Sequence, residues 1–131
     1  MSLVVDASTV VAALIDAGHH GQWAVARMQG ERLAAPHILH AEVANVLRRS
    51  EFAGDISEDV AGLAYSDLLD LAVDLYPFEP FAERVWALRR TVTAYDGWYV
   101  ALAESIGASV ATLDTRLAAA PGPECGFETP S

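Results

Sequence analysis

Leu3-Val4-Val5-Asp6-Ala7-Ser8 places a short apolar run, a carboxylate and a small polar residue side by side near the start of the chain. A continuous apolar run of this length predicts a buried β-strand over residues 3–6. Ser8 is a good helix cap, so we expect a helix from Thr9 to about Ala17. A buried strand that passes directly into a helix is the repeating unit of a parallel α/β sheet.

Apolar runs and amphipathic segments alternate along the rest of the chain. Strands that alternate with helices predict an α/β fold with a mainly parallel sheet. Right-handed crossovers then place helices on both faces, in three α/β/α layers, and the length suits a single domain over residues 1–131. The expected strands cover residues 33–35, 73–78 and 109–113, with a marginal one near Phe127, and the expected helices cover residues 22–28, 38–52, 57–71, 81–92 and 96–106.

Composition narrows the classes of function that the chain can have. Its 131 residues are 53% hydrophobic and 20% charged, which is typical of a folded domain with its own core. The formal net charge of −10 repels nucleic acid unless cations stand between the two. All eight basic residues are arginine, and the absence of lysine excludes a P-loop nucleotide site and Schiff-base chemistry. One cysteine and no apolar run long enough to span a bilayer predict a cytoplasmic protein.

Four acidic residues stand out by their positions in this pattern. Asp6 and Asp114 follow expected strands, so they lie at the edge of the sheet where α/β proteins bind ligands. Glu42 lies off the apolar stripe of its helix, and Asp96 begins another helix. If the four converge, they form an oxygen-rich pocket suited to Mg²⁺ or Mn²⁺. The alternatives are helix capping for Asp96 and Asp114 and a solvated position for Glu42.

The segments around these acids resemble one known family. Val4–Ser8 resembles the first-strand motif of the PIN-domain ribonucleases, and within them of the VapC-type toxins of bacterial toxin–antitoxin pairs. His40–Leu47 is similar to the helix that carries the family's second acid. Thr93–Glu104 is similar to the third-acid helix and Ala111–Leu117 to the strand end with the fourth. The segments follow in the family's order and spacing, although Gly97 stands where a residue such as alanine is usual.

The resemblance implies a hydrolytic endoribonuclease that depends on Mg²⁺ or Mn²⁺. It implies that Asp6 anchors the metal, that Asp96 and Glu42 complete the site, and that Asp114 holds a second ion or its water. Attack by water does not need the substrate's 2′-hydroxyl, so the preference for RNA over DNA comes from the resemblance alone.

The resemblance also implies a small VapB-type antitoxin as partner. The apolar stripes of helices 38–52 and 57–71 exceed what one small core needs, so they would offer a groove for an apolar helix of this inhibitor. The same surface would support a homodimer, and core packing is the alternative.

Several further side chains are candidates for a supporting role. Ser8 and Thr112 each lie two residues from an acid and would orient waters through their hydroxyls. The alternatives are capping for Ser8 and packing within the strand for Thr112. Asn45 and Arg116 are candidate contacts to a phosphate or to the ligands.

Some aromatic and basic side chains would also suit an RNA substrate. Trp23, Trp86 and Trp98 can stack on bases, although tryptophan in an amphipathic helix is more often part of a core. Arg48-Arg49 and Arg89-Arg90 are candidate RNA contacts, and surface ion pairs with the many acids are the alternative.

Two other classes of protein compete with the nuclease hypothesis. A receiver-like phosphotransfer domain also groups acids at strand ends, but it uses a lysine near the phosphate, and this chain has none. A non-catalytic binding module on the same fold does not need the acids to converge. A structure with all four carboxylates within metal-ligand distance of one point would favour the nuclease.

Overall fold

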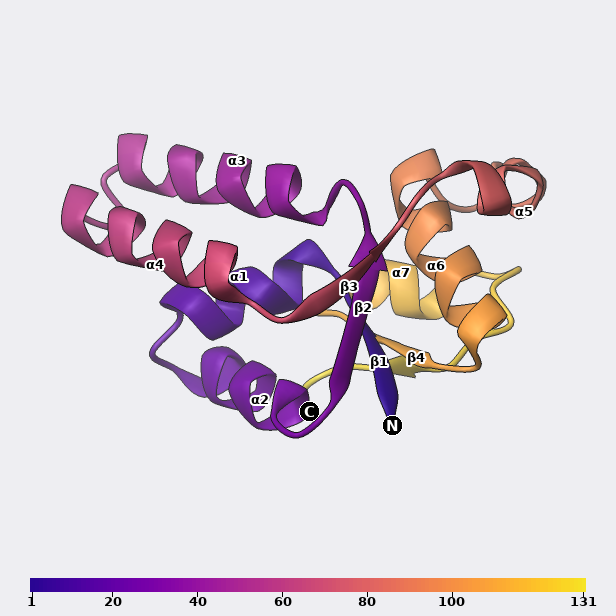
Figure 1. Cartoon of the computed structure of the whole chain (residues 1–131), viewed down its shortest axis with the longest axis horizontal. Helices are drawn as coiled ribbons and strands as arrows, with labels where there is room; N and C mark the ends of the chain where they lie inside the picture. Colours follow the sequence, from indigo (N-terminus) through magenta and orange to yellow (C-terminus); the bar gives the residue numbers. More distant parts are fainter.

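Five parallel strands and eight helical segments make up the computed structural model, which describes all 131 residues. The strand order is β3-β2-β1-β4-β5, with β1 at the centre (Figure 1). The predicted parallel sheet is therefore confirmed. The elements are β1 (Ser2–Val5), α1 (Ala7–Ile15), α2 (His19–Met28), β2 (Arg32–Pro36), α3 (Leu39–Phe52), α4 (Glu58–Asp70), β3 (Val73–Tyr76), the 3₁₀ turn η1 (Glu79–Phe81), α5 (Ala82–Ala87), α6 (Ala94–Ile106), β4 (Ser109–Ala111), α7 (Thr115–Ala119) and β5 (Phe127–Glu128).

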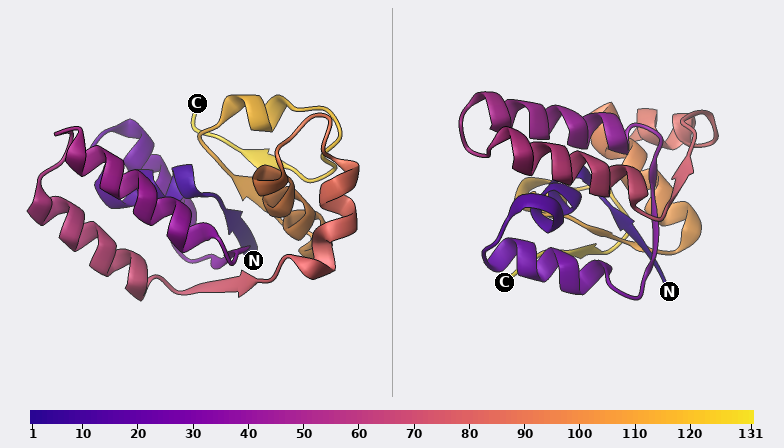
Figure 2. Two further views of the ribbon diagram at one scale, coloured as in Figure 1. Left: turned by 90° about the horizontal axis from the view of Figure 1, so that it is seen from above. Right: turned by 60° about the vertical axis from the view of Figure 1, so that its left-hand side comes forward.

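The helices form two layers around the sheet. Helices α1 to α4 lie on one side of it and α5 to α7 on the other, as the views from the front and from above show (Figures 1 and 2). The chain builds β1, β2 and β3 outward in one direction and then returns to place β4 on the other side of β1. The order thus reverses between β1 and β4, and this reversal creates a topological switch point at their carboxyl ends. No helix in the structure is long and apolar enough to cross a membrane.

The apolar run that opens the chain becomes the central strand. Leu3, Val4 and Val5 are almost fully buried, because helices cover both faces of β1. Val5 pairs in register with Ala111 of β4, so the two strands end level with each other. The residues that follow these strands therefore emerge side by side at the switch point.

Several predicted boundaries differ from the structure at helix starts. Ser8 is not the cap of α1, because Asp6 takes this role and accepts a hydrogen bond from Thr9 N. Asp96 is not the cap of α6 either, because the helix begins earlier and Thr93 caps it. The predicted helix over residues 81–92 is shorter and ends at Ala87, where turns follow. The helix α7, capped by Asp114, was not predicted.

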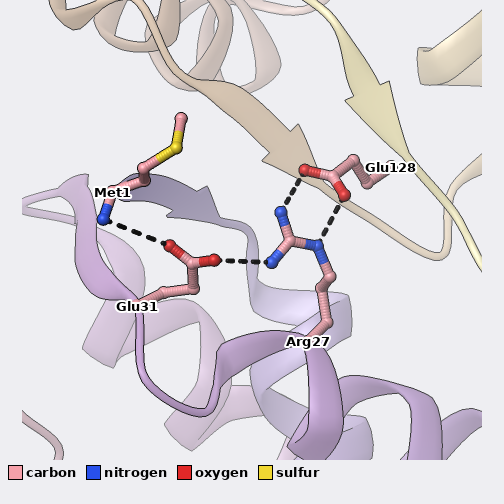
Figure 3. A network of polar contacts seen from close by, with 4 residues as sticks. All are labelled: Met1, Arg27, Glu31 and Glu128. Carbon is pink, nitrogen blue, oxygen red and sulfur yellow. Dashed lines mark hydrogen bonds and ion pairs between the residues drawn. The ribbon is translucent and has the colours of Figure 1, made fainter.

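A network of charged groups fixes the last strand to the first half of the chain. Arg27 of α2 donates two hydrogen bonds to the carboxylate of Glu128 in β5 and a third to Glu31, which also pairs with the amino terminus (Figure 3). The strand β5 is only two residues long. We therefore expect its attachment to depend on this bidentate pair more than on backbone pairing.

Replacing Arg27 with methionine tests this attachment. The variant keeps the aliphatic stem but removes the fork that holds Glu128, so we expect a loss of about 1 kcal/mol in the free energy of unfolding. Arg32→Met is the matched control, because the Arg32–Asp74 pair is exposed to solvent, where water and salt screen it, and its loss should have a smaller effect. Urea unfolding measures both. Equal losses in the two variants would mean that the Arg27 network adds nothing specific.

Candidate active site at the carboxyl edge of the sheet

Asp6 is the most enclosed acid at the switch point, with 7% of its surface exposed. Its Oδ1 atom accepts hydrogen bonds from Ser8 Oγ at 2.7 Å and from Thr9 N at 3.1 Å, and its Oδ2 atom accepts one from Thr112 Oγ1. Burial raises the pKa of Asp6, and these hydrogen bonds to its charged form oppose the shift. The side chain is thus held in one orientation from both oxygens.

The two hydroxyl groups that contact Asp6 also hold the loop after β4. Ser8 Oγ accepts a hydrogen bond from Leu113 N at 3.0 Å, and Thr112 Oγ1 accepts one from Asp114 N at 2.9 Å. Both side chains therefore contact the Asp6 carboxylate directly and link it to the backbone that carries Asp114. They fix the relative positions of the two strand-end acids.

Asp114 and Asp96 come from the other side of the site. Asp114 Oδ1 accepts hydrogen bonds from Arg116 N and Leu117 N, so Asp114 caps a helix, which the sequence left open as the alternative to metal binding. Its Oδ2 atom makes no hydrogen bond. Asp96 lies in the first turn of α6. Burial raises the pKa of Asp96, and the charges of Asp114 and Asp6 raise it further.

Glu42 reaches the same site from α3, across the edge of the sheet. Its Oε1 atom accepts a hydrogen bond from Tyr99 Oη at 2.6 Å. Burial raises the pKa of Glu42, the Tyr99 hydrogen bond lowers it, and the charges of Asp96 and Asp6 raise it again. The mutual effects show that the acids lie within electrostatic reach of one another.

Tyr99 is the site residue that the sequence interpretation missed. Its side chain is buried, with 1% exposed, and it lies three residues after Asp96, on the same face of α6. The spacing from Asp96 was the available signal, but the apolar run around it favoured a core position. Burial and the hydrogen bond to Glu42 raise the pKa of Tyr99, so it stays a neutral donor.

The Tyr99→Phe variant tests whether this hydrogen bond matters for the site. Phenylalanine keeps the buried ring but leaves a half-buried Glu42 oxygen without its donor. We expect the RNA cleavage that the resemblance implies to fall by about 10-fold or more, as for other residues that orient a ligand. Tyr65→Phe is the control, because Tyr65 is exposed on α4. Cleavage by Tyr99→Phe at the wild-type rate would mean that Glu42 needs no such support.

The four acids gather at one edge, yet they do not form a closed cage. No group of three or more His, Cys, Asp or Glu side chains is close enough together to hold a metal ion. The criterion of a common point within ligand distance is therefore not met by the metal-free chain. Mg²⁺, however, is usually held by one or two carboxylates together with waters and substrate phosphate. Uncompensated carboxylates that raise one another's pKa fit such a cation.

An open hollow of about 340 Å³ adjoins two of the acids. Arg116 is exposed at the wall of this hollow and forms no ion pair. Asn45 is exposed on α3, and its side chain makes no hydrogen bond. The hollow thus offers room beside the carboxylates for a group that brings its own charge. The residues that line it are Thr91, Val92, Thr93, Asp96, Asp114, Arg116, Leu117 and Ala120.

The raised pKa values predict how the metal-free protein responds to pH. Asp6, Glu42 and Asp96 bind protons more tightly in the folded chain than in the unfolded chain. Protonation therefore stabilises the folded state as the pH falls through their raised pKa values toward the ordinary pKa of a carboxyl group. In chelator we expect the free energy of unfolding to rise as the pH falls from 7.5 toward 5. The opposing acids, Glu104 and Glu128, have lowered pKa values and lose their contribution only at lower pH. Thermal melts that show a steady loss on acidification would contradict this account.

Comparison with known proteins places this arrangement in a family. The PIN domain family matches residues 3–123, so the chain belongs to the PIN-domain proteins. Ribonuclease VapC1 of Mycobacterium tuberculosis is 42% identical over 93% of this chain and 92% of its own length. The crystal structure of PAE2754 from Pyrobaculum aerophilum superposes with a TM-score of 0.71 at 25% identity, over 97% of this chain and 83% of that one. VapBC2 from Rickettsia felis, solved bound to a DNA fragment from its promoter, superposes with a TM-score of 0.70 at 13% identity, over the whole of both chains.

Proposed function

We propose that this protein is the ribonuclease toxin of a toxin–antitoxin pair, and that it hydrolyses RNA with Mg²⁺ or Mn²⁺ held by Asp6, Glu42, Asp96 and Asp114. The ribonuclease activity follows from membership in the PIN-domain family and from the 42% identity to a ribonuclease over nearly the full chain. The observation that supports the metal is the group of mutually repelling carboxylates at the switch point, of which Asp6 is buried and the others are half-buried. The domain would span residues 1–131 and work in the cytoplasm.

Each acid contributes differently to such a site. Asp6 is fixed by hydrogen bonds to both oxygens, so it supplies a rigid anchor. In Glu42, Oε1 accepts the hydrogen bond from Tyr99 and Oε2 is left to bind a cation. In Asp114, Oδ1 caps α7 and Oδ2 is left to bind a cation. Asp96 is within electrostatic reach of both strand-end acids, because the charges of Asp114 and Asp6 both raise its pKa. A divalent cation would supply the positive charge that draws a phosphate in and makes water a better nucleophile.

Ser8 and Thr112 support the anchor in this proposal. Each hydroxyl donates to Asp6 and accepts from the backbone of the loop that leads to Asp114. They hold the two strand-end acids at a constant separation while substrate binds. Arg116, at the wall of the adjacent hollow, would contact a phosphate of the RNA.

A small antitoxin is the proposed partner. An apolar groove of about 570 Å³ lies between α1 and α3, lined by Val11, Ile15, Val46 and Leu113, and it reaches Ser8 beside Asp6. A smaller hollow lies between α3 and α4, where the sequence predicted the groove. An inhibitor helix in the larger groove would end next to the acids, where a basic side chain could replace the cation. The homodimer stays a prediction.

A cleavage assay tests the proposal and separates it from its alternatives. The purified protein should cut single-stranded RNA or a structured RNA loop with Mg²⁺ or Mn²⁺, and cleavage should stop when chelator is added. A DNA oligonucleotide of the same sequence is the control for substrate class. A binding module or a phosphotransfer domain would leave the RNA intact under all of these conditions, which would overturn the proposal.

Co-expression with the neighbouring small open reading frame tests the partner. The toxin alone should arrest growth, and the pair should restore growth and co-purify as one complex on size exclusion. Replacing a basic residue of the inhibitor that reaches the acids should release cleavage activity. Growth arrest that persists with the neighbour present, and no complex, would contradict the antitoxin proposal.

A further inference from the structure

Trp86 is an exposed aromatic side chain with an arginine stacked on its ring. It lies on α5 with 68% of its surface exposed, whereas Trp23 and Trp98 pack against the core. The Arg89 guanidinium lies over the Trp86 ring, 4.5 Å from its centroid, and Arg89 Nη1 donates to Trp86 O at 2.9 Å. The two contacts hold Arg89 against one face of the indole, and the rest of the ring is open to solvent.

This stack lies close to the acids of the proposed active site. Helix α5 packs against α6 on the side of the sheet opposite α1 to α4 (Figures 1 and 2). A Cβ atom on Gly97 would lie 3.3 Å from Val85 Cγ1 and 3.6 Å from Val85 Cα, so the two helices nearly touch there. Val85 precedes Trp86, and Gly97 follows Asp96. The glycine that departs from the family pattern therefore allows α5 to approach the start of α6.

Residues 85–93, which connect Trp86 to the start of α6, carry positive charge in an otherwise acidic chain. Residues 85–93 contain Arg89 and Arg90 and no acid, in a protein with a net charge of −10. Neither arginine forms an ion pair, although 18 acidic residues are present. Thr91, the next residue, lines the hollow that also contains Asp96 and Asp114. An unpaired positive segment thus leads from Trp86 directly to the acids.

We propose that Trp86, Arg89 and Arg90 form a binding site for single-stranded RNA, in which a base stacks on the Trp86 ring and the arginines contact the flanking phosphates. The inference rests on the proposed function, because the RNA strand would continue from this site into the hollow beside Asp96. Stacking on an aromatic ring tolerates any base, and arginine adds charge that the acidic surface lacks. The site would therefore position the strand and would not by itself select a sequence.

Binding of a short RNA to a non-cleaving protein tests this site. A fluorescein-labelled single-stranded RNA is titrated with the Asp6→Asn protein, and its dissociation constant is measured by anisotropy. Trp86→Ala in this background should raise the dissociation constant by about 5- to 150-fold, because one stacked base contributes this much. Trp86→Phe should keep part of the affinity, which separates stacking from a general effect on the fold.

The chain contains a matched control for the stack. Phe52 is 72% exposed at the outer end of α3, with Arg48 lying 5.1 Å from its ring centroid. This second arginine–aromatic pair lies at the opposite end of the molecule from α5 (Figure 1). Phe52→Ala should change the dissociation constant by less than about 2-fold.

A nucleotide scan locates the base that stacks. Abasic positions are introduced one at a time along the RNA, and one of them should remove the difference between the Asp6→Asn protein and its Trp86→Ala variant. Equal RNA affinity with and without Trp86 would overturn the proposal. So would a Trp86→Ala variant that binds RNA normally but no longer binds the antitoxin or a second copy, since the surface would then be a protein interface. Intact RNA and no binding by the wild-type protein would instead contradict the proposed function itself.

Discussion

Replacing Asp6 with asparagine is expected to lower RNA cleavage by about 100-fold or more while the protein stays folded. Asp6 is the acid with the most fixed position, because Ser8, Thr9 and Thr112 all donate to its carboxylate. Asparagine has nearly the same shape and can still accept from Thr9 N, so the helix cap survives. It lacks the negative charge that would hold a cation, so the activity should be lost while the fold is kept.

Asp67→Asn is the control for this variant. Asp67 is exposed on α4, and its substitution also removes one negative charge from the protein. Both variants are compared with the wild type in Mg²⁺, with circular dichroism and a thermal melt to verify folding. Full activity in Asp6→Asn would exclude Asp6 from the reaction. An equal loss in Asp67→Asn would show that overall charge, and not the site, controls cleavage.

Asp96→Asn is expected to stabilise the metal-free protein. Burial raises the pKa of Asp96, and its repulsion from Asp114 and Asp6 adds to this, so the charged side chain opposes folding. Removing the charge should raise the free energy of unfolding in chelator, by at most about 1 kcal/mol because solvent screens this half-buried side chain, and the melting temperature by at most about 4 °C. The backbone N–H of residue 96 still donates its hydrogen bond to Thr93 Oγ1, which caps α6, so the helix start is unaffected.

The same variant should respond less to metal. Mg²⁺ at 100 times its dissociation constant should stabilise the wild-type protein by about 2.7 kcal/mol, and this gain should shrink in Asp96→Asn. Melts with and without Mg²⁺ measure both effects. A variant that is less stable than the wild type in chelator would indicate that Asp96 serves the fold and binds no metal.

The placement of Asp6 and Asp114 followed from the sequence because it depends on a general rule of parallel sheets. Each acid ends an apolar run, and the carboxyl ends of parallel strands share one edge. The cap of α1 was assigned to Ser8, but Asp6 reaches Thr9 N from one turn earlier, and the Ser8 hydroxyl then donates to Asp6 instead. The choice between two polar residues only two positions apart depends on backbone geometry that the sequence pattern does not contain.

The contact between Tyr99 and Glu42 could not be predicted in the same way. The two residues lie 57 positions apart, and their hydrogen bond depends on how α3 and α6 pack across the end of the sheet. Helix α7 was missed for another reason, since five residues are too few to show a helical period. For Trp86 the sequence favoured a core position, because tryptophan in an amphipathic helix is more often part of a core, but the side chain lies outside on α5.

Anomalous X-ray scattering at the manganese edge tests the central claim most directly. Crystals of the wild-type protein are soaked in Mn²⁺ at a concentration at which the protein cleaves RNA in solution. We predict a manganese peak at the carboxyl edge of the sheet, in contact with Asp6 and at least one of Glu42, Asp96 and Asp114, and no such peak in Asp6→Asn crystals. No peak at this edge, or a peak that remains unchanged in Asp6→Asn, would contradict the assignment of these acids to a metal-dependent ribonuclease site.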